Sequence, residues 1–360
     1  MDSIPKGKQI APFLVFFIIH SMQIGVGALG FQRFIAKTAG YDSWISVLIA
    51  LAFSHIIMFI IFKIVKLGKG DLIDTHYFVY GKIVGRIFNL LFAIYFIIIT
   101  VTIVRPYVEI LQTWVFLNGS VFWFTLSFLL LAIYIINGGF RTIVGIAFFS
   151  VIIPFYLYFI FLFTLPYTDF SDFLPILDHS LQDIFKASLH LSISYLGYET
   201  LLIFYPFIQN GMDGKKWAHL GLLFTGFIYL YITILSFSYY SEEQLQHVIW
   251  PTLSMWKIVK LSFIWRFEYI GITTWSLVIL PNICIALWCA SRIIKKTINI
   301  SQKVSLYIIA PLVLIISLIL QTRQQIDQYI TWVGNIGIII NYFYIPLLLL
   351  LVIIARKVRK

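Results

Sequence analysis

IGVGALGF, residues 24–31, decides how this chain folds. It places three glycines, Gly25, Gly27 and Gly30, at the end of an apolar stretch that begins near Ile10. Each glycine in a helix interior costs about 1 kcal/mol relative to alanine. Because a regular helix would not carry so many of them so close together, this stretch predicts a break in a membrane-spanning helix.

The composition of the whole chain is that of a membrane protein. It has 360 residues, of which 61% are hydrophobic and only 11% charged, and its mean hydropathy is +0.94. Soluble domains do not reach these values, so we expect a polytopic membrane protein. In a soluble protein the net charge of +11 would suggest nucleic-acid binding. Here the basic residues lie mostly in short loops between apolar stretches, where they set the orientation in the membrane.

Ten apolar stretches are long enough to span a membrane. They lie at about 10–32, 44–65, 86–104, 119–137, 142–165, 184–208, 217–240, 269–293, 304–321 and 330–355. Most of the 26 Lys and Arg residues fall on the side of the two termini, which predicts that both termini are cytoplasmic. No segment outside these stretches is large enough to hold its own core, so residues 1–360 are expected to form a single membrane domain.

The sixth stretch, IFKASLHLSISYLGYETLLIFYPFI (184–208), is interrupted like the first. Its middle holds polar or helix-weakening residues, namely Ser192, Ser194, Gly197 and Glu199. It opens the second set of five spans, and an odd number of helices per repeat inverts the second repeat. We therefore expect an all-α integral membrane protein with ten transmembrane helices in a 5+5 inverted repeat, with helices 1 and 6 broken. The repeats would cover about 10–165 and 184–355.

The two breaks together predict a binding site. Unwound backbone is costly in lipid and survives where it lines a cavity. Half-helix N-termini favour an anionic group such as a carboxylate, and glycine allows close approach to the main chain. The site is therefore expected between Gly25–Gly30 and Ser194–Glu199. The alternative is that the small residues serve only tight helix packing.

Two connections are predicted to hold amphipathic helices at the membrane surface. DLIDTHYFVYGK (71–82) precedes the third span on the inner side. On the outer side, residues 241–266 begin with Ser241 and two glutamates, which is typical of a helix start, and contain three tryptophans.

Several stretches resemble a known family over essentially the full length. They are GVGALGFQR (25–33), GYDSWI (40–45), SISYLGYETLLIFYPFI (192–208), VIWPTLSMW (248–256) and WRFEYI (265–270). Together they are similar to the B subunit of the Ger-type nutrient receptors of bacterial endospores. That family belongs to the amino acid–polyamine–organocation (APC) transporter superfamily, whose fold is LeuT-like.

The resemblance implies a function that spacing does not reveal. Such a subunit would lie in the inner membrane of a dormant spore, bind a small nutrient, often an amino acid, and signal with an A subunit and a C subunit. The alternative is an amino-acid transporter of the same superfamily. The fifth span (143–163) has no ionisable side chain that could couple transport to protons, which favours sensing over pumping.

The expected ligand-binding residues come from both breaks and from two neighbouring spans. They are Gly25, Val26, Gly27, Gly30, Tyr95, Ser194, Leu196, Gly197, Tyr198, Glu199 and Asn282. Val26, Leu196 and Tyr198 would suit an apolar ligand side chain. The resemblance places Tyr95 on a helix that lines the site, and in the broken-helix fold the helix of Asn282 flanks it.

Each polar candidate also has a structural reading. Glu199 is an acid inside a span, which is expensive and usually functional, yet it could instead hold the break in its own helix by hydrogen bonding. Asn282 could pack two helices together. Tyr95 is one of 21 tyrosines, most of which are expected to be structural.

Nothing in the sequence indicates an enzyme. It contains no H-E-x-x-H, no G-x-S-x-G and no phosphate-binding loop. Cys284 and Cys289 would lie on different faces of one helix, and they match no metal spacing. We expect no catalytic residue, no cofactor and no metal site, and the expected partners are the nutrient, the two receptor subunits and the lipid bilayer.

Overall fold

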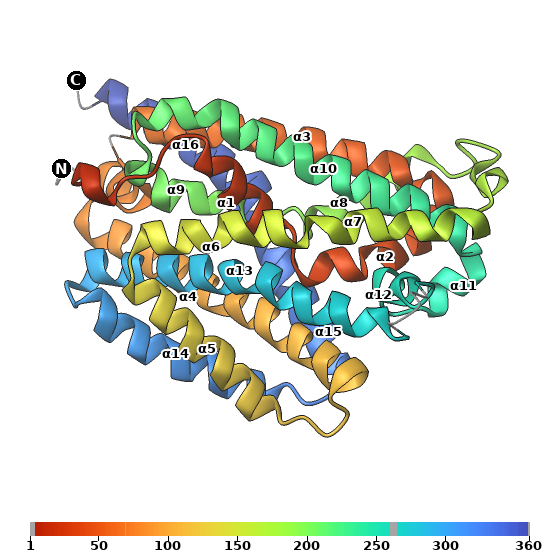
Figure 1. The fold of residues 1–360 in the computed structure, drawn as a ribbon. Coiled ribbons are helices and arrows are strands. Elements are labelled where there is room, and N and C mark those ends of the chain that lie inside the picture. Colours follow the sequence, from red (N-terminus) through yellow and green to blue (C-terminus); the bar gives the residue numbers. More distant parts are fainter. Residues whose placement is uncertain (1–3, 69, 260–264, 359–360) are drawn as a thin grey trace.

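The computed structural model describes residues 4–68, 70–259 and 265–358, and within these residues it contains helices but no strands. The helices (Figure 1) are α1 (Leu14–Gln23), α2 (Phe31–Ala39), α3 (Ser43–Leu67), α4 (Leu72–Ile110), α5 (Val121–Asn137), α6 (Phe140–Ile152), α7 (Tyr156–Ile160), α8 (Leu181–Ser192), α9 (Leu201–Phe204), α10 (Gly214–Tyr239), α11 (Glu242–His247), α12 (Pro251–Trp256), α13 (Phe267–Ile298), α14 (Gln302–Ile319), α15 (Arg323–Ile338) and α16 (Ile345–Val358). The predicted all-α class is confirmed.

Seven helical segments of the described chain are long and apolar enough to cross a membrane. They are Phe31–Leu67, Leu72–Val115, Phe140–Tyr167, Gly211–Tyr239, Phe267–Ile298, Gln302–Ile319 and Arg323–Val358. Of the other predicted spans, the first and fourth contain the shorter apolar helices α1 and α5, and the sixth is divided between α8 and α9. The chain is thus a multi-pass membrane protein, and the count of ten spans stays a prediction.

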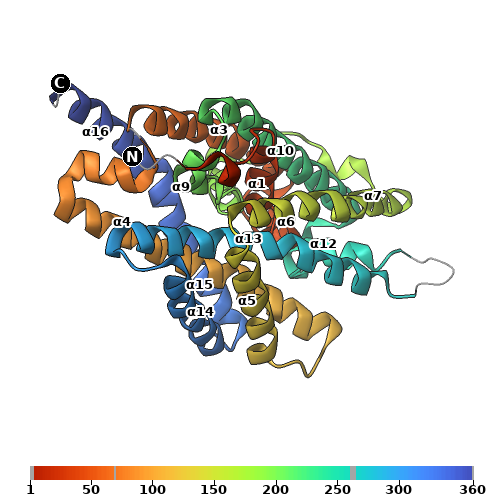
Figure 2. The same ribbon diagram turned by 60° about the vertical axis from the view of Figure 1, so that its left-hand side comes forward.

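The long helices run side by side, and both ends of the described chain lie at the same end of the bundle (Figures 1 and 2). We call this the terminal end. Helix α13 lies in the middle of the bundle and packs against α4, α5, α6 and α14. In its most apolar window 83% of the residues are buried by protein, whereas the corresponding figure for Arg323–Val358 is 22%. A helix that is apolar on all sides is suited to such a central place.

The first break begins directly before the three glycines and includes them. Helix α1 ends at Gln23, and Ile24 is extended. A short 3₁₀ turn, Val26–Leu29, follows before α2 begins at Phe31. A Cβ atom on Gly30 would lie 2.9 Å from the carbonyl oxygen of Ile249, so this glycine allows the outer loop to pack directly on the break.

The second break lies directly against the first. Helix α8 ends at Ser192, and Gly197 has a φ of +117°, in the left-handed region that favours glycine. A Cβ atom there would lie only 2.8 Å from the carbonyl oxygen of Met22, near the end of α1. Any larger residue at position 197 would therefore push the two breaks apart.

The same two parts of the chain also meet at the terminal end. The amide of Ile10 donates to the carbonyl of Phe207 at 2.8 Å, and the amide of Gln209 donates back to Ile10 at 3.0 Å. This short parallel bridge ties the segment before α1 to the segment after α9. The halves of both interrupted helices that lie towards the terminal end are thereby held together.

A helix is present where the sequence predicts one at 71–82, and its place at the membrane surface stays a prediction. Asp71 caps its N-terminus by accepting a hydrogen bond from the amide of Asp74 at 3.1 Å. The helix turns at Gly81, whose φ is +75°, and then continues as the long part of α4. On the opposite side Ser241 caps α11 as its sequence predicts, and α12 follows. Residues 260–264 of the predicted outer helix lie outside the described residues.

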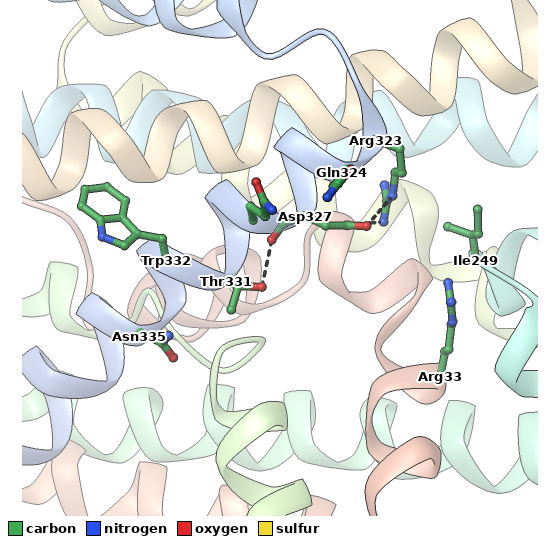
Figure 3. A pocket seen from close by; sticks show the side chains of 9 residues that line it. Arg33, Ile249, Arg323, Gln324, Asp327, Thr331, Trp332 and Asn335 are labelled. Carbon is green, nitrogen blue, oxygen red and sulfur yellow. Dashed lines mark hydrogen bonds and ion pairs between the residues drawn. The ribbon is translucent and has the colours of Figure 1, made fainter.

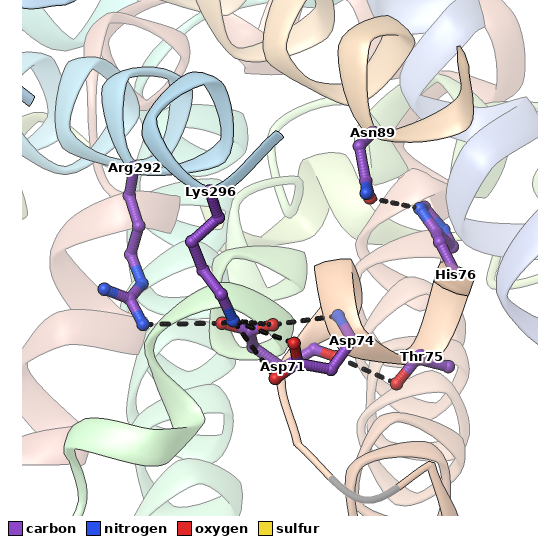
Figure 4. Close-up of polar contacts among 7 residues, drawn as sticks. All are labelled: Asp71, Asp74, Thr75, His76, Asn89, Arg292 and Lys296. Carbon is purple, nitrogen blue, oxygen red and sulfur yellow. Dashed lines mark hydrogen bonds and ion pairs between the residues drawn. The ribbon is translucent and has the colours of Figure 1, made fainter. Parts of the chain in front are cut away.

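A cluster of charges fastens this amphipathic helix to α13 (Figure 4). The Nζ atom of Lys296 lies 2.8 Å from Asp71 and 3.0 Å from Asp74, and Arg292 lies 3.4 Å from Asp71. The side chain of Asp71 has no exposed surface. The guanidinium of Arg292 also stacks over the ring of Phe207 at 4.5 Å, which connects the cluster to the backbone bridge described above.

Replacing Asp71 with asparagine should destabilise the protein strongly. The asparagine side chain can still cap the helix, but Arg292 and Lys296 lose their buried counter-ion, and breaking a buried pair costs about 3–5 kcal/mol. The measurement is the free energy of unfolding in detergent. Asp183→Asn is the matched control, because its partner Lys186 is half exposed and such pairs contribute about 1 kcal/mol or less. Equal losses in both variants would contradict the role assigned to the cluster.

Candidate functional site

A partly open cavity of about 110 Å³ is lined by residues of both breaks. We call it the central cavity. A single water needs about 15 Å³ of such space, so it has room for several waters or a very small ligand. Its lining comes from the first break (Met22, Gln23, Gly25), the second break (Ile193, Ser194, Leu196, Gly197), α4 (Ile99, Thr102, Ile103), α13 (Asn282) and α15 (Ile330, Val333, Gly334).

Two buried side-chain oxygens on residues of this lining have no hydrogen-bond partner among the described residues. They are Oε1 of Gln23 and Oδ1 of Asn282. The amide nitrogen of each side chain is already used, since Gln23 donates to the carbonyl of Tyr195 at 2.8 Å and Asn282 donates to that of Ile24 at 3.1 Å. Because backbone carbonyls can only accept, the two amide orientations are determined. The remaining oxygens are two buried acceptors on residues of the cavity lining, and native structures rarely leave such atoms unpaired.

Five of the predicted ligand-binding residues line the central cavity together: Gly25, Ser194, Leu196, Gly197 and Asn282. Gly27 lies beside it, because a Cβ atom there would be 3.1 Å from the hydroxyl of Ser194. Gly25 is equally close to α13, with its virtual Cβ 3.0 Å from Nδ2 of Asn282. The glycines thus let the break pack closely against both neighbours.

Five other predicted residues do not belong to the cavity lining. Gly30 packs against the outer loop, and Val26, Tyr95, Tyr198 and Glu199 are buried around the breaks. As ligand contacts they remain predictions. Their position is that of a supporting layer behind the cavity wall.

Glu199 shows how this supporting layer works. Its Oε1 accepts a hydrogen bond from the hydroxyl of Tyr95 at 2.8 Å, and its Oε2 accepts one from the amide of Gly197, also at 2.8 Å. The residue is 1% exposed. Both oxygens are therefore engaged in holding the second break against α4, which favours the structural reading of this acid.

Nine lining residues were absent from the predicted set: Met22, Gln23, Ile99, Thr102, Ile103, Ile193, Ile330, Val333 and Gly334. Gln23 is a polar residue directly before the glycine stretch, which is a signal that sequence reasoning could have used. Thr102 and Gly334 carry no comparable signal. A Cβ atom on Gly334 would lie 2.8 Å from Ile193, so this glycine lets α15 pack onto the second break.

A larger and more open pocket of about 750 Å³, which we call the outer pocket, shares helix α15 with the central cavity. It is lined by Arg33, Ile249, Arg323, Gln324, Asp327, Gln328, Thr331, Trp332 and Asn335 (Figure 3). Arg323 is paired with Glu109 at 2.7 Å and with Asp327 at 2.8 Å. The same turns of α15 line both spaces, since Thr331, Trp332 and Asn335 border the outer pocket and Ile330, Val333 and Gly334 border the central cavity.

The two arginines of the outer pocket differ in their ion pairing. Arg323 has two carboxylate partners, whereas no ion pair of Arg33 is found within the described ranges. The remaining polar residues recur every three or four positions on α15, so one face of that helix is polar. A polar helix face in a membrane protein is expected to border water rather than lipid.

Comparison with known proteins places the chain in a family. A family model described as spore germination protein matches residues 9–326. The chain is 39% identical over 360 residues to spore germination protein GerQB of Bacillus cereus, covering 100% of both chains. It is also 25% identical over 359 residues to spore germination protein A2 of Bacillus subtilis (strain 168), covering 94% of each.

Two solved structures share the fold at much lower sequence identity. One is the substrate-bound outward-open state of a Na⁺-coupled sialic acid symporter, with a TM-score of 0.68, 12% identity, and coverage of 94% of this chain and 79% of that one. Another is MhsT in complex with L-phenylalanine, with a TM-score of 0.63, 11% identity, and coverage of 95% and 98%. These similarities confirm the predicted LeuT-like fold class.

Tyr95→Phe should destabilise the protein by about 1–3 kcal/mol. The change removes only the hydroxyl that donates to Glu199, and hydrogen bonds to charged or buried acceptors have this magnitude. Thermal unfolding in detergent measures the loss. Tyr134→Phe is the control, since Tyr134 is 79% exposed on the outside of α5 and its change should stay within about 0.5 kcal/mol. A Tyr95→Phe protein as stable as the wild type would refute the supporting role.

Proposed function

The chain belongs to the Spore_permease family of spore germination proteins, and from this we propose that it is the nutrient-sensing membrane subunit of a germination receptor. It binds a small germinant such as an amino acid between the two interrupted helices. It then signals to an A subunit and a C subunit in the spore inner membrane, with both of its termini in the cytoplasm. It binds its ligand without catalysing a reaction.

The observation that carries this proposal is the pair of buried, unpartnered acceptors on two residues that line the central cavity. An ammonium group has only donors, and Oε1 of Gln23 and Oδ1 of Asn282 would accept from it. The backbone at the start of the Val26–Leu29 turn would favour the carboxylate. Aliphatic lining residues such as Ile99, Ile193 and Val333 suit a small apolar side chain. The L-phenylalanine complex of MhsT supports an amino acid as the ligand class, because that protein has the same fold.

The proposed signal is a shift between two arrangements of the interrupted helices. A ligand that binds one arrangement more tightly increases its population. In the arrangement of this structure the breaks touch at Gly197, and the halves towards the terminal end are bridged through Ile10 and Phe207. A ligand larger than the central cavity would have to separate these contacts. We propose that the two repeats, about 10–165 and 184–355, move relative to each other within one membrane domain, and that the partner subunits detect this movement.

An amino-acid transporter is the second candidate. The observation in its favour is the fold that the chain shares with a Na⁺-coupled symporter. Against it, helix α6 and the residues that continue it to Tyr167 contain Arg141 near the helix start as their only charged side chain. A coupling ion would find no carboxylate there.

The decisive experiment uses spores that lack only this chain. Germination is measured against single amino acids, sugars and nucleosides, and amino-acid uptake by growing cells is measured in parallel. Loss of the response to one nutrient, with uptake intact, is the expected result and identifies the ligand class. Normal germination with reduced uptake would favour the transporter.

Gly27→Leu should abolish the response to that nutrient. Its Cβ atom would lie 3.1 Å from the hydroxyl of Ser194, so the rest of the leucine would displace the wall of the central cavity. Germination of spores carrying the variant is the measurement, with the amount of protein determined by immunoblotting. Gly145→Leu is the matched control, because nothing lies within 4 Å of its virtual Cβ. A normally produced Gly27→Leu protein that still responds would show that the site lies elsewhere.

A further inference from the structure

A third cavity, of about 690 Å³, lies at the terminal end, away from the two breaks. It is formed where α4 turns back on itself and meets the last turns of α13 (Figures 1 and 2). We call it the terminal groove. Its lining is Tyr77, Lys82, Ile83, Arg86, Ile87, Leu90, Lys296 and Thr297.

The turn at Gly81 gives the terminal groove its shape. Gly81 has a φ of +75°, which separates the surface helix that begins at Leu72 from the spanning part of α4. A Cβ atom on Gly85 would lie 2.9 Å from the carbonyl of His76, so the two parts pack closely. The residues between these glycines are thereby presented on the outside of the corner.

One wall of the terminal groove is apolar and continues along the surface of the bundle. Ile83 is 79% exposed and Ile87 is 54% exposed. Leu91 and Ile94, each 54% exposed, extend the same face of α4 at helical spacing. In a spanning helix such a stripe borders the acyl chains of the membrane, so the groove opens directly into lipid.

The other feature of the terminal groove is an excess of positive charge. Lys82 and Arg86 are exposed and take part in no ion pair within the described part of the chain. They stand four residues apart on one helix face, an arrangement in which like charges repel each other. Lys296 also lines the groove, but its charge and that of Arg292 are balanced by Asp71 and Asp74 (Figure 4). The unbalanced positive charge of the groove therefore comes from Lys82 and Arg86.

We propose that the terminal groove binds an anionic phospholipid of the surrounding membrane. The phosphate lies between Lys82 and Arg86, beside Lys296, and one acyl chain follows Ile83 and Ile87 along α4. Tyr77 stands at the level of the headgroup, where aromatic side chains are favoured. Basic pockets at the membrane surface next to spanning helices are suited to such headgroups.

The assignment of an anionic phospholipid depends on both the positive charge and the apolar wall of the terminal groove. A free phosphate ion would satisfy the two cations but leave the apolar wall uncovered. A zwitterionic lipid would cover the wall but bring a positive group towards Lys82 and Arg86. Only a ligand with a net negative headgroup and an acyl chain matches both the charge and the apolar stripe.

The test compares lipids on the purified, full-length protein in detergent. Phosphatidylglycerol and phosphatidylcholine with identical acyl chains are titrated, and bound lipid is counted by native mass spectrometry. We expect phosphatidylglycerol to bind at least about tenfold more tightly, and Lys82→Gln/Arg86→Gln to abolish most of that preference. Both substitutions are at exposed positions, so the variant should fold.

The control variant is Lys216→Gln/Lys357→Gln. It removes the same number of exposed positive charges from the terminal end, at the start of α10 and near the end of α16, and should keep the preference. Glycerol 3-phosphate is the competitor without an acyl chain, and it should not displace the lipid. The proposal is overturned if the Lys82→Gln/Arg86→Gln protein binds phosphatidylglycerol like the wild type, if the control loses the preference equally, or if glycerol 3-phosphate competes as well as the lipid does.

Discussion

The contact between Gly197 and the carbonyl of Met22 is the constraint around which the interior is arranged. Interrupted helices expose backbone groups that lipid cannot satisfy, so each break must be covered by protein. Here the breaks cover each other. Gln23 donates to the carbonyl of Tyr195, and Tyr229 donates to the carbonyl of Gln23, both at 2.8 Å. The central cavity is the space that this mutual packing leaves open.

Helix α13 supports this arrangement from one side. In its middle, Asn282 donates to the carbonyl of Ile24, and Trp275 donates to that of Gly25 at 3.3 Å. At its end, Arg292 and Lys296 hold the surface helix of α4 through Asp71. One continuous, buried helix therefore contacts both the first break and the surface at the terminal end. A movement of the break relative to α13 would change contacts that lie along the same rigid element.

Charges at the terminal end serve two different purposes. Asp71 is fully buried, and its two cations neutralise it, so this cluster joins one helix to another. Lys82 and Arg86 lie a short distance further along the chain, at the turn of α4, where they are exposed and have no carboxylate partners among the described residues. The first group stabilises the fold by pairing within it, whereas the second is available to a negatively charged group from outside.

The sequence by itself determined the class of the fold and the places where its helices are interrupted. Composition and the apolar stretches indicated the class, and the glycines of residues 24–31 together with Gly197 indicated the interruptions, because hydropathy and the cost of glycine in a helix are local properties. Only the tertiary structure decided which groups reach the central cavity. Glu199 accepts from Tyr95, which is 104 residues away, and Gly334 brings α15 onto the second break. Such contacts depend on which helix faces meet, and packing between distant segments sets this rather than any local pattern.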